Sequence, residues 1–349
     1  MDQSVLIAMS GGVDSSVAAK LILEQGFACA GGMMRLFEGS SQDAEDARSV
    51  TQRLGIDFHL LDFSQMFRSC VMDAFVASYE AGDTPNPCIE CNRHLKFGAL
   101  LEKARAMGHS HIATGHYARI CQDAATGRWL LYKAADADKD QSYVLYSLTQ
   151  DQLAHTLLPL GELTKERVRQ LAQEHGFVNA NRKDSQDICF VPDGDYVAFM
   201  KRHTGKTYAP GDFLDLQGNR VGRHQGAVCY TLGQRKGLGL AMGAPVYVCG
   251  KDMAHNTVTV GPNEALFQKK LLARDCNWMP FESLQEPIRV QAKARYRHKE
   301  QPATVYPLED GGVLVEFDEP QRAITPGQAV VFYDGDLVVG GGTVTATVE

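Results

Sequence analysis

The stretch that decides the fold of this chain is Ser10-Gly11-Gly12-Val13-Asp14-Ser15-Ser16. It follows the apolar, β-type residues 5–9 and precedes apolar positions at helical spacing, which predicts a strand, a tight glycine turn and a helix start. Two glycines let an anion approach the backbone closely, and the N–H groups and dipole of a helix start favour negative charge there. The expected ligand is a phosphate, and the order SGGxDS indicates the pyrophosphate end of ATP. It is not a Walker loop, because no Gly-Lys-Ser/Thr follows. An ordinary glycine-rich turn with serine caps is the alternative.

Strands and helices alternate through the first third of the chain. Strands are expected at 5–9, 28–35, 57–61 and 111–114, and helices from 13 to about 25 and at 41–54, 66–79 and 95–107; beyond Asp151 the pattern becomes helical, with a helix at 163–175. Such alternation predicts an α/β doubly wound parallel sheet with its ligand at the carboxyl ends of the strands. From about Tyr208 short β-rich runs separated by turns predict two small β-barrel domains, with runs at 246–249, 257–260, 313–317, 329–333 and 337–339. The expected domains are 1–200, 205–265 and 270–349.

The composition is typical of a soluble globular enzyme, with 349 residues, 44% of them hydrophobic, and a net charge of −7. The negative charge argues weakly against a general nucleic-acid binder. It leaves room for a local basic surface, and Arg289, Lys293, Arg295, Arg297 and Lys299 alternate so that one strand face would carry several cations. An ordinary solvated strand face is the alternative. No membrane span and no signal peptide are recognised, so a cytoplasmic protein without a membrane partner is expected.

A second candidate site lies in Thr84-Pro85-Asn86-Pro87-Cys88-Ile89-Glu90-Cys91-Asn92. The prolines should hold the chain extended as far as Cys88, which would place Cys91 at a helix start, where a thiolate is favoured. Cys189 is the third candidate among nine cysteines that are odd in number and scattered, and therefore no disulfide framework. Two incidental thiols are one alternative. Zinc with His94 as an extra ligand is another, although a structural zinc site usually wants four ligands.

With both sites in hand, the chain closely resembles the bacterial tRNA-specific 2-thiouridylases, a family within the PP-loop ATP pyrophosphatases. The matching motifs run through nearly the whole sequence: SGGVDSS (10–16), TPNPCxxCN (84–92), ATGHYAR (113–119), KDQSYVLY (139–146), KDSxxICF (183–190), YTLGQRKGLG (230–239), ARYR (294–297) and TPGQAVVFYDG (325–335). SGGxDS alone would serve many ATP-using ligases and thiolases. The ordered set is far more specific.

The resemblance implies a sulfurtransferase that adenylates C2 of the wobble uridine in tRNAs for Glu, Lys and Gln and then replaces the oxygen with sulfur. It assigns Cys91 as the nucleophile and Cys189 as the persulfide carrier, and lets these two cysteines form a transient disulfide. Asp14 is expected to help hold Mg²⁺, from its charge beside the phosphates. The implied ATP-binding residues are Ala8, Met9, Ser10, Gly11, Gly12, Val13, Asp14, Ser15, Met34 and Gly115.

The same resemblance implies a tRNA surface. Asn86, Pro87 and Cys88 would face the target base, while other contacts to tRNA would come from His116, Lys139, Asp140, Gln141, Arg295, Tyr296 and Gln328. Recognition of an anticodon loop would use stacking and splayed bases, and the uridine would have to leave its stack. Each of these residues could equally be part of a solvated loop or, for Tyr296, a half-buried strand.

Cys88 is the informative departure, because some members of the family carry Asp at that position. Three cysteines, Cys88, Cys91 and Cys189, could hold a 4Fe–4S cluster with one iron open for sulfide. The alternative is a persulfide relay in which a cysteine desulfurase and carrier proteins deliver sulfur to Cys189. Two rival functions also remain at this point: another PP-loop thiolase or an ATP-dependent ligase, and a non-catalytic tRNA-binding or Fe–S module.

Overall fold

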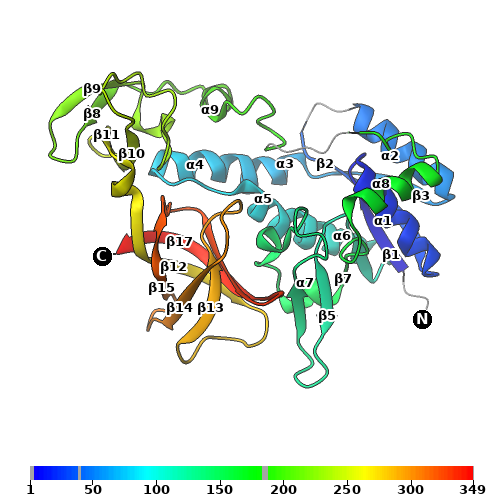
Figure 1. Ribbon diagram of the computed structural model, residues 1–349. Coiled ribbons are helices and arrows are strands. Elements are labelled where there is room, and N and C mark those ends of the chain that lie inside the picture. The colour runs from blue at the N-terminus through cyan, green and yellow to red at the C-terminus, as the bar shows by residue number, and fades with distance from the viewer. Residues whose placement is uncertain (1–3, 38–40, 183–187, 349) are drawn as a thin grey trace.

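A five-stranded parallel sheet forms the centre of the N-terminal domain in the computed structural model, which describes residues 4–37, 41–182 and 188–348 (Figure 1). Its strand order is β3-β2-β1-β4-β7, so the strand before the glycine turn lies in the middle. Val5, Leu6 and Ile7 are fully buried, as expected for a parallel strand covered on both faces. The strands are β1 (Ser4–Met9), β2 (Ala28–Arg35), β3 (Asp57–Asp62), β4 (His111–Ala113) and β7 (Thr156–Leu157).

Helices cover both faces of this sheet, which confirms the predicted doubly wound architecture. Val5 and Ile7 pack in one core cluster with residues of α1 (Val13–Glu24), α2 (Ser41–Leu54) and α8 (Lys165–Glu174). Leu6, on the other face of the same strand, packs with Leu100 of α6 (Leu100–Ala106). Alternate side chains of β1 thus face opposite layers.

Two long helices with internal π-helical turns connect the sheet to the other domains. The first comprises α3 (Ser64–Phe67), η1 (Arg68–Asp73) and α4 (Ala74–Ala81), and it runs from the sheet toward the middle domain (Figure 1). The second comprises α5 (Pro87–Glu90), η2 (Cys91–Ala99) and α6. Turns of π-helix are rare and occur frequently at functional sites.

The second helix corrects the expected geometry around the cysteines. Asn86 caps it, since its Oδ1 accepts from the backbone N–H of Cys88 at 3.2 Å, and Pro87 occupies the first helical position. Proline there has the required φ and loses no hydrogen bond, so it starts the helix rather than extending the chain. The expectation that Cys91 stands at the helix start was therefore wrong: Cys91 lies one turn inside and is buried.

The C-terminal half is built of two β structures, as predicted. The middle domain holds a four-stranded sheet, and the last domain is a barrel closed by pairing of its first and last strands, β12 and β17. A hairpin from the N-terminal part of the chain, β5–β6, extends the barrel sheet, which the sequence did not indicate. The strands are β5 (Arg119–Gln122), β6 (Trp129–Tyr132), β8 (Gly211–Leu214), β9 (Arg220–His224), β10 (Tyr247–Asp252), β11 (Thr257–Gly261), β12 (Phe267–Trp278), β13 (Ile288–Lys293), β14 (Gln301–Pro307), β15 (Val313–Arg322), β16 (Ala329–Asp334) and β17 (Leu337–Val348).

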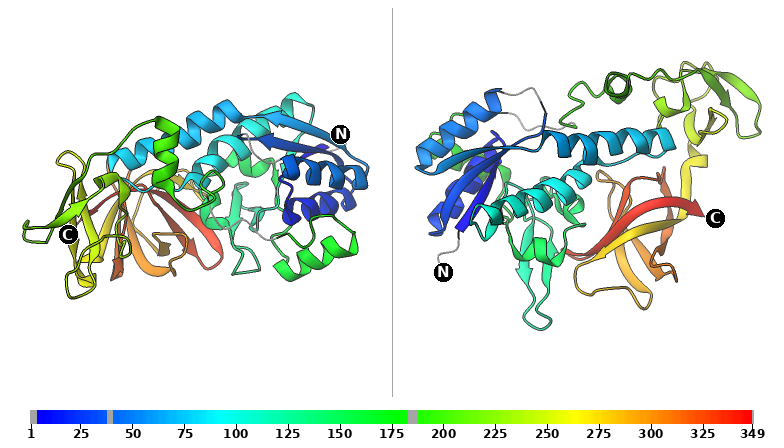
Figure 2. Two further views of the ribbon diagram at one scale, coloured as in Figure 1. Left: turned by 90° about the horizontal axis from the view of Figure 1, so that it is seen from above. Right: turned by 180° about the vertical axis from the view of Figure 1, so that it is seen from behind.

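The three parts form an elongated arrangement in which the middle domain and the parallel sheet lie at opposite ends (Figure 2). The limits 1–200, 205–265 and 270–349 stay predictions. None of the described helices has the length and apolar character of a membrane span. The remaining short helices are α7 (Gln150–Ala154), α9 (Tyr196–Thr204), η3 (Ser142–Leu145), η4 (Ala227–Cys229) and η5 (Asn263–Leu266).

The predicted basic strand face does not form. β13 ends at Lys293, so only Arg289 and Lys293 of the run are on a strand, and Arg289 pairs with Asp318 at 2.8 Å. Beyond the strand Arg295 turns inward, where its Nη2 donates to the Leu232 carbonyl at 3.2 Å and to the Thr325 hydroxyl. A guanidinium held by these partners joins the barrel to the middle domain rather than presenting its charge to solvent.

Asn92 anchors the cysteine-bearing helix, and its replacement by Ala should lower the free energy of unfolding by about 1–3 kcal/mol. Its side chain is 1% exposed, and its Nδ2 donates to the Val144 carbonyl at 2.9 Å, which Ala would leave buried and unpaired. Urea denaturation of the full chain measures the change, with Lys103→Ala on exposed surface of α6 as the control. Equal stability of the two variants would contradict the anchoring role.

Candidate functional site

The glycine turn between β1 and α1 has the geometry of an anion-binding loop. Gly11 has φ +74°, and a Cβ there would lie 2.6 Å from the Asp43 carbonyl oxygen, so only glycine fits. Gly12 is the N-cap of α1 and makes no side-chain cap hydrogen bond, while Ser15 Oγ donates to the Gly12 carbonyl at 3.0 Å. Because no side chain caps this helix, the N–H groups of its first turn and the positive end of its dipole remain directed at the glycine turn.

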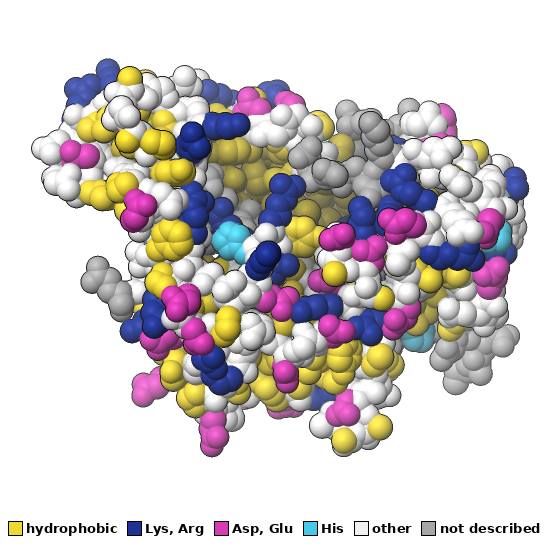
Figure 3. All heavy atoms as spheres, in the orientation of Figure 1, with side chains coloured by type: hydrophobic (Ala, Val, Ile, Leu, Met, Phe, Trp, Pro, Cys, Tyr) yellow, Lys and Arg dark blue, Asp and Glu magenta, His cyan; other side chains and the backbone are white. Residues whose placement is uncertain are grey.

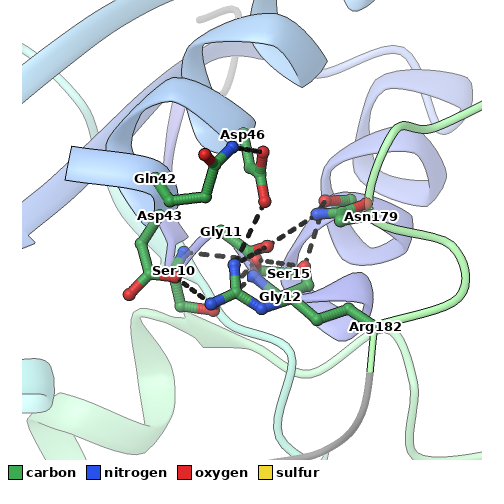
Figure 4. A network of polar contacts seen from close by, with 10 residues as sticks. Ser10, Gly11, Gly12, Ser15, Gln42, Asp43, Asp46, Asn179 and Arg182 are labelled. Atoms are coloured by element: carbon green, nitrogen blue, oxygen red, sulfur yellow. Dashed lines mark hydrogen bonds and ion pairs between the residues drawn. The ribbon is translucent and has the colours of Figure 1, made fainter. Parts of the chain in front are cut away.

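Three side chains from one later segment hold this turn in place. Lys165, at the start of α8 and 5% exposed, donates to both Asp14 oxygens at 2.7 and 2.8 Å. Asn179 Nδ2 donates to the Gly11 carbonyl at 2.8 Å and to Ser16 Oγ at 3.0 Å (Figure 4). Arg182 Nη1 lies 3.4 Å from the same carbonyl.

Sequence reasoning missed Lys165, Asn179 and Arg182. They lie more than 150 positions from the turn, and no local pattern marks them. Lys165 lies in the first turn of the amphipathic helix α8, and its burial, at 5% exposure, becomes visible only in the tertiary structure. Buried lysines require a partner, and the partner here is the carboxylate of the motif.

The predicted nucleotide residues divide into those that line a cavity and those that support it. Ser10, Gly12, Val13 and Asp14 line a cavity of about 700 Å³. Gly115 lies against the turn, where a Cβ would be 2.8 Å from the backbone of Asp14. Among the remaining predicted residues, Gly11 and Ser15 form the turn, Ala8, Met9 and Met34 lie in strands β1 and β2, and Ala8 and Met34 pack against the core.

The same cavity is lined by Cys88, Cys91 and Cys189. Helix α5–η2 supplies the first two, and the stretch before α9 supplies the third. The two sites that the sequence predicted separately therefore share one space. A nucleotide held at the glycine turn and a sulfur carried by a cysteine would face the same bound molecule.

Burial disfavours the thiolate form of two of the cavity cysteines, Cys91 and Cys189. Burial raises the pKa of the Cys91 thiol, an effect that Lys96 opposes and Cys88 reinforces. Removal from water raises the pKa of Cys189 to about 11, with further increases from Cys91 and Cys88, although one side of the residue is exposed. The expectation of a favoured thiolate at Cys91 was thus wrong, because burial inside the helix outweighs any helix-start effect.

The cysteines do not have a metal-binding arrangement. Within residues 4–37, 41–182 and 188–348, no group of three or more His, Cys, Asp or Glu side chains is placed to hold a metal ion. His94, the extra ligand considered for zinc, is directed to Glu90, with 3.2 Å between Nε2 and Oε2. The described residues as they stand therefore fit neither the 4Fe–4S cluster nor zinc.

The residues expected to touch tRNA divide into those that line the cavity and those that make contacts within the protein. Pro87, Cys88, Lys139, Gln141 and Tyr296 line the cavity, as does Arg297. Asn86 caps the cysteine helix, and Asp140 stabilises its own turn by accepting from the Ser142 hydroxyl at 2.8 Å.

The other predicted tRNA residues serve internal contacts. Gln328 Nε2 donates to the Thr84 carbonyl at 2.7 Å, so it joins the barrel to the loop before the cysteines. His116 is paired with the Thr114 hydroxyl at 2.8 Å, and burial lowers its pKa well below the usual value, so the imidazole is neutral. Arg295 is the interdomain contact described above. On the face shown in Figure 3, acidic and basic side chains are interspersed.

The sequence matches known family models along nearly the whole chain. Residues 3–193 match the tRNA methyl transferase HUP domain, residues 197–262 the tRNA methyl transferase PRC-barrel domain, and residues 268–344 the aminomethyltransferase beta-barrel domain. Among solved structures, a 4-thiouridine synthetase–RNA complex with bound ATP is similar with a TM-score of 0.36 at 16% identity, covering 58% of this chain and 50% of that one.

Curated relatives of full length share about half of the residues. The tRNA-specific 2-thiouridylase MnmA of Clostridioides difficile is 48% identical over 355 residues, covering 99% of this chain and 98% of the relative. The protein of the same name from Acetivibrio thermocellus is 49% identical, covering 98% and 99%. With the nucleotide loop and the cysteine pair in one cavity and this similarity extending from end to end, the chain belongs to the tRNA-specific 2-thiouridylase family.

Proposed function

We propose that this protein is a tRNA-uridine 2-sulfurtransferase that uses ATP to convert uridine in tRNA to 2-thiouridine. One observation carries the proposal: the SGGVDSS turn and all three candidate cysteines line a single cavity of about 700 Å³. A ligase would need the nucleotide turn without the cysteines, and a binding module would need neither. Family membership supports the same reaction.

The first step is adenylation of the base. A carbonyl oxygen at C2 of uridine is a poor leaving group, and its attack on the α-phosphate of ATP would convert it into an adenylate with release of pyrophosphate. The glycine turn and the N-terminus of α1 would stabilise the charge that develops on the phosphates. Mg²⁺ would enter with ATP. Asp14, the carboxylate of the motif, would help to hold it, and Lys165 already pairs with this carboxylate.

The second step is sulfur transfer. A persulfide on Cys189 would attack C2 with its terminal sulfur, and AMP would leave with the oxygen. Cys91 would then attack the Cys189 sulfur and release 2-thiouridine, leaving a Cys91–Cys189 disulfide that a dithiol must reduce. Sulfur would reach Cys189 from a cysteine desulfurase or a carrier protein. This relay fits the described cysteines better than the 4Fe–4S route, for which they lack the grouping.

The proposed substrates are tRNAs for Glu, Lys and Gln, modified at the wobble uridine. The uridine would have to leave the anticodon stack to reach the cavity, as in enzymes that flip bases. Lys139, Tyr296 and Arg297 stand at the cavity wall, where a stacking ring and cations suit a single-stranded loop. Asn86 and Gln328 would act by positioning the cysteine helix and its preceding loop.

Asp14→Asn should abolish tRNA-dependent release of pyrophosphate from ATP and should also lower the free energy of unfolding by about 3 kcal/mol, because it leaves the buried Lys165 without its counter-charge. Asp14→Asn combined with Lys165→Met should recover much of the stability without recovering turnover. Pyrophosphate release and thermal melting measure the two effects. Normal turnover in the stable double variant would contradict the role of Asp14.

Cys91→Ser should bind ATP normally and fail to form 2-thiouridine, since Ser cannot resolve a mixed disulfide. Nucleoside mass spectrometry of unmodified tRNA-Glu incubated with Mg-ATP, a desulfurase and cysteine measures the product. Cys121→Ser, at an exposed position on β5, serves as the control and should retain activity. Full thiolation by Cys91→Ser would refute the relay, and no product from the wild type would refute the proposed function.

The alkylation rate of Cys189 should still be rising at pH 10, because only the thiolate reacts and its pKa is about 11. Below that pH the rate should increase about tenfold per pH unit, whereas in denaturant the profile should level off near the ordinary thiol pKa of about 8.5. Iodoacetamide labelling of the wild type, read by peptide mass spectrometry, gives the profile. A plateau near pH 8 in the folded protein would contradict the buried environment.

A further inference from the structure

We propose that Arg182 binds the phosphates of the nucleotide and that Asp43 and Asp46 hold its guanidinium at the glycine turn until the nucleotide arrives. The inference deepens the proposed function and rests on it in so far as the turn binds ATP. Neither Arg182 nor the two aspartates belongs to the nucleotide motif of the sequence, which ends at Ser16.

The guanidinium sits between the glycine turn and the first turns of α2. Its Nη1 is 3.1 Å from Asp46 Oδ2 and 3.4 Å from the Gly11 carbonyl oxygen, and its Nη2 forms an ion pair with Asp43. Figure 4 shows the side chain reaching across the mouth of the turn to both carboxylates. The two aspartates thus occupy the donors that a phosphate group would use.

The position of this cation differs from that of Lys165. The Lys165 side chain is 6% exposed and bound to both Asp14 oxygens, so it is a fixed part of the loop. The Arg182 side chain is 39% exposed and lines the cavity together with Ser10, Gly12 and Asp43. A planar guanidinium at the cavity wall can bind two phosphate oxygens at once, which an ammonium cannot.

The charges around the turn favour an exchange of partners. At the turn itself three carboxylates, Asp14, Asp43 and Asp46, are paired with only two cations, Lys165 and Arg182, which leaves an excess of one negative charge. A triphosphate that binds there meets less repulsion if Arg182 turns from the aspartates to the phosphate oxygens. Asp46 does not itself line the cavity, so it acts on the nucleotide only through the guanidinium or through its field.

Because of this exchange of partners, substitutions of Arg182 and of Asp46 should change the affinity for Mg-ATP in opposite directions. Arg182→Met should weaken binding of Mg-ATP about tenfold or more, which is the loss of one charge-assisted contact. Asp46→Asn should tighten it several-fold, because the guanidinium loses a competing partner while Gln42, the other partner of Asp46, can still hydrogen-bond the new amide. Arg182→Lys should fall between the wild type and Arg182→Met, since an ammonium keeps the charge without the fork.

Isothermal titration calorimetry of the full chain with Mg-ATP and no tRNA measures these affinities. Glu45→Gln, an exposed residue on the same helix, removes a charge without touching Arg182 and controls for the general field. The decisive quantity is the coupling in a double-mutant cycle: Asp46→Asn should have little effect in the Arg182→Met background. Thermal melting of each variant confirms that it is folded.

Opposite signs with strong coupling would support the inference. Weaker ATP binding by both Arg182→Met and Asp46→Asn would overturn it, because Arg182 would then be a structural tie between the turn and α2. An Asp46→Asn effect that persists without Arg182, or that Glu45→Gln reproduces, would overturn it as well. Failure of the wild type to bind Mg-ATP would reject both the inference and the proposed function, whereas strong coupling in a protein that never thiolates tRNA would reject the proposed function alone.

Discussion

The ion pair between Lys165 and Asp14 is the interaction on which the rest of the site depends. Asp14 follows the glycine turn and Lys165 opens α8, so the pair fixes two helices on the same face of the sheet. The Lys165 side chain is 6% exposed, so the loss of Asp14 would leave a buried ammonium without its counter-charge. The geometry of the turn is therefore set by a residue 151 positions away.

The cysteine-bearing helix provides the second constraint. It begins at Pro87 under the cap of Asn86, carries Cys88 and Cys91 in its first turns, and continues as α6 into the core beneath the sheet. Its loop is clamped from the barrel, since Thr84 donates its N–H to the Pro326 carbonyl at 2.9 Å. The third domain thus contacts the loop that leads into the cysteine-bearing helix. Any movement of the barrel on tRNA would act on the position of that helix.

Burial of the thiols has a chemical consequence for a sulfurtransferase. A cysteine kept protonated resists adventitious oxidation, because the thiolate is the form that reacts. Cys189 and Cys91 line one cavity together with the rings of Phe67 and Phe190. Among cavity residues, Lys96 is the cation that opposes this effect at both sulfurs. The site is thereby set for reaction with a bound partner rather than with solvent.

The sequence alone determined the fold class, the family, the glycine turn and the three cysteines, because these depend on local periodicity and on short ordered motifs. It misjudged Cys91, since whether Pro87 extends a chain or starts a helix depends on Asn86 folding back as a cap. It also misjudged Arg295, whose spacing resembles that of a strand face although its side chain turns inward to Thr325 of its own barrel and to Leu232 of the middle domain. Only the tertiary structure placed Lys165, Asn179 and Arg182 on the turn and joined both sites in one cavity. These residues are brought together by the packing of α8 against α1. Such contacts between distant parts of the chain do not produce a periodic pattern in the sequence.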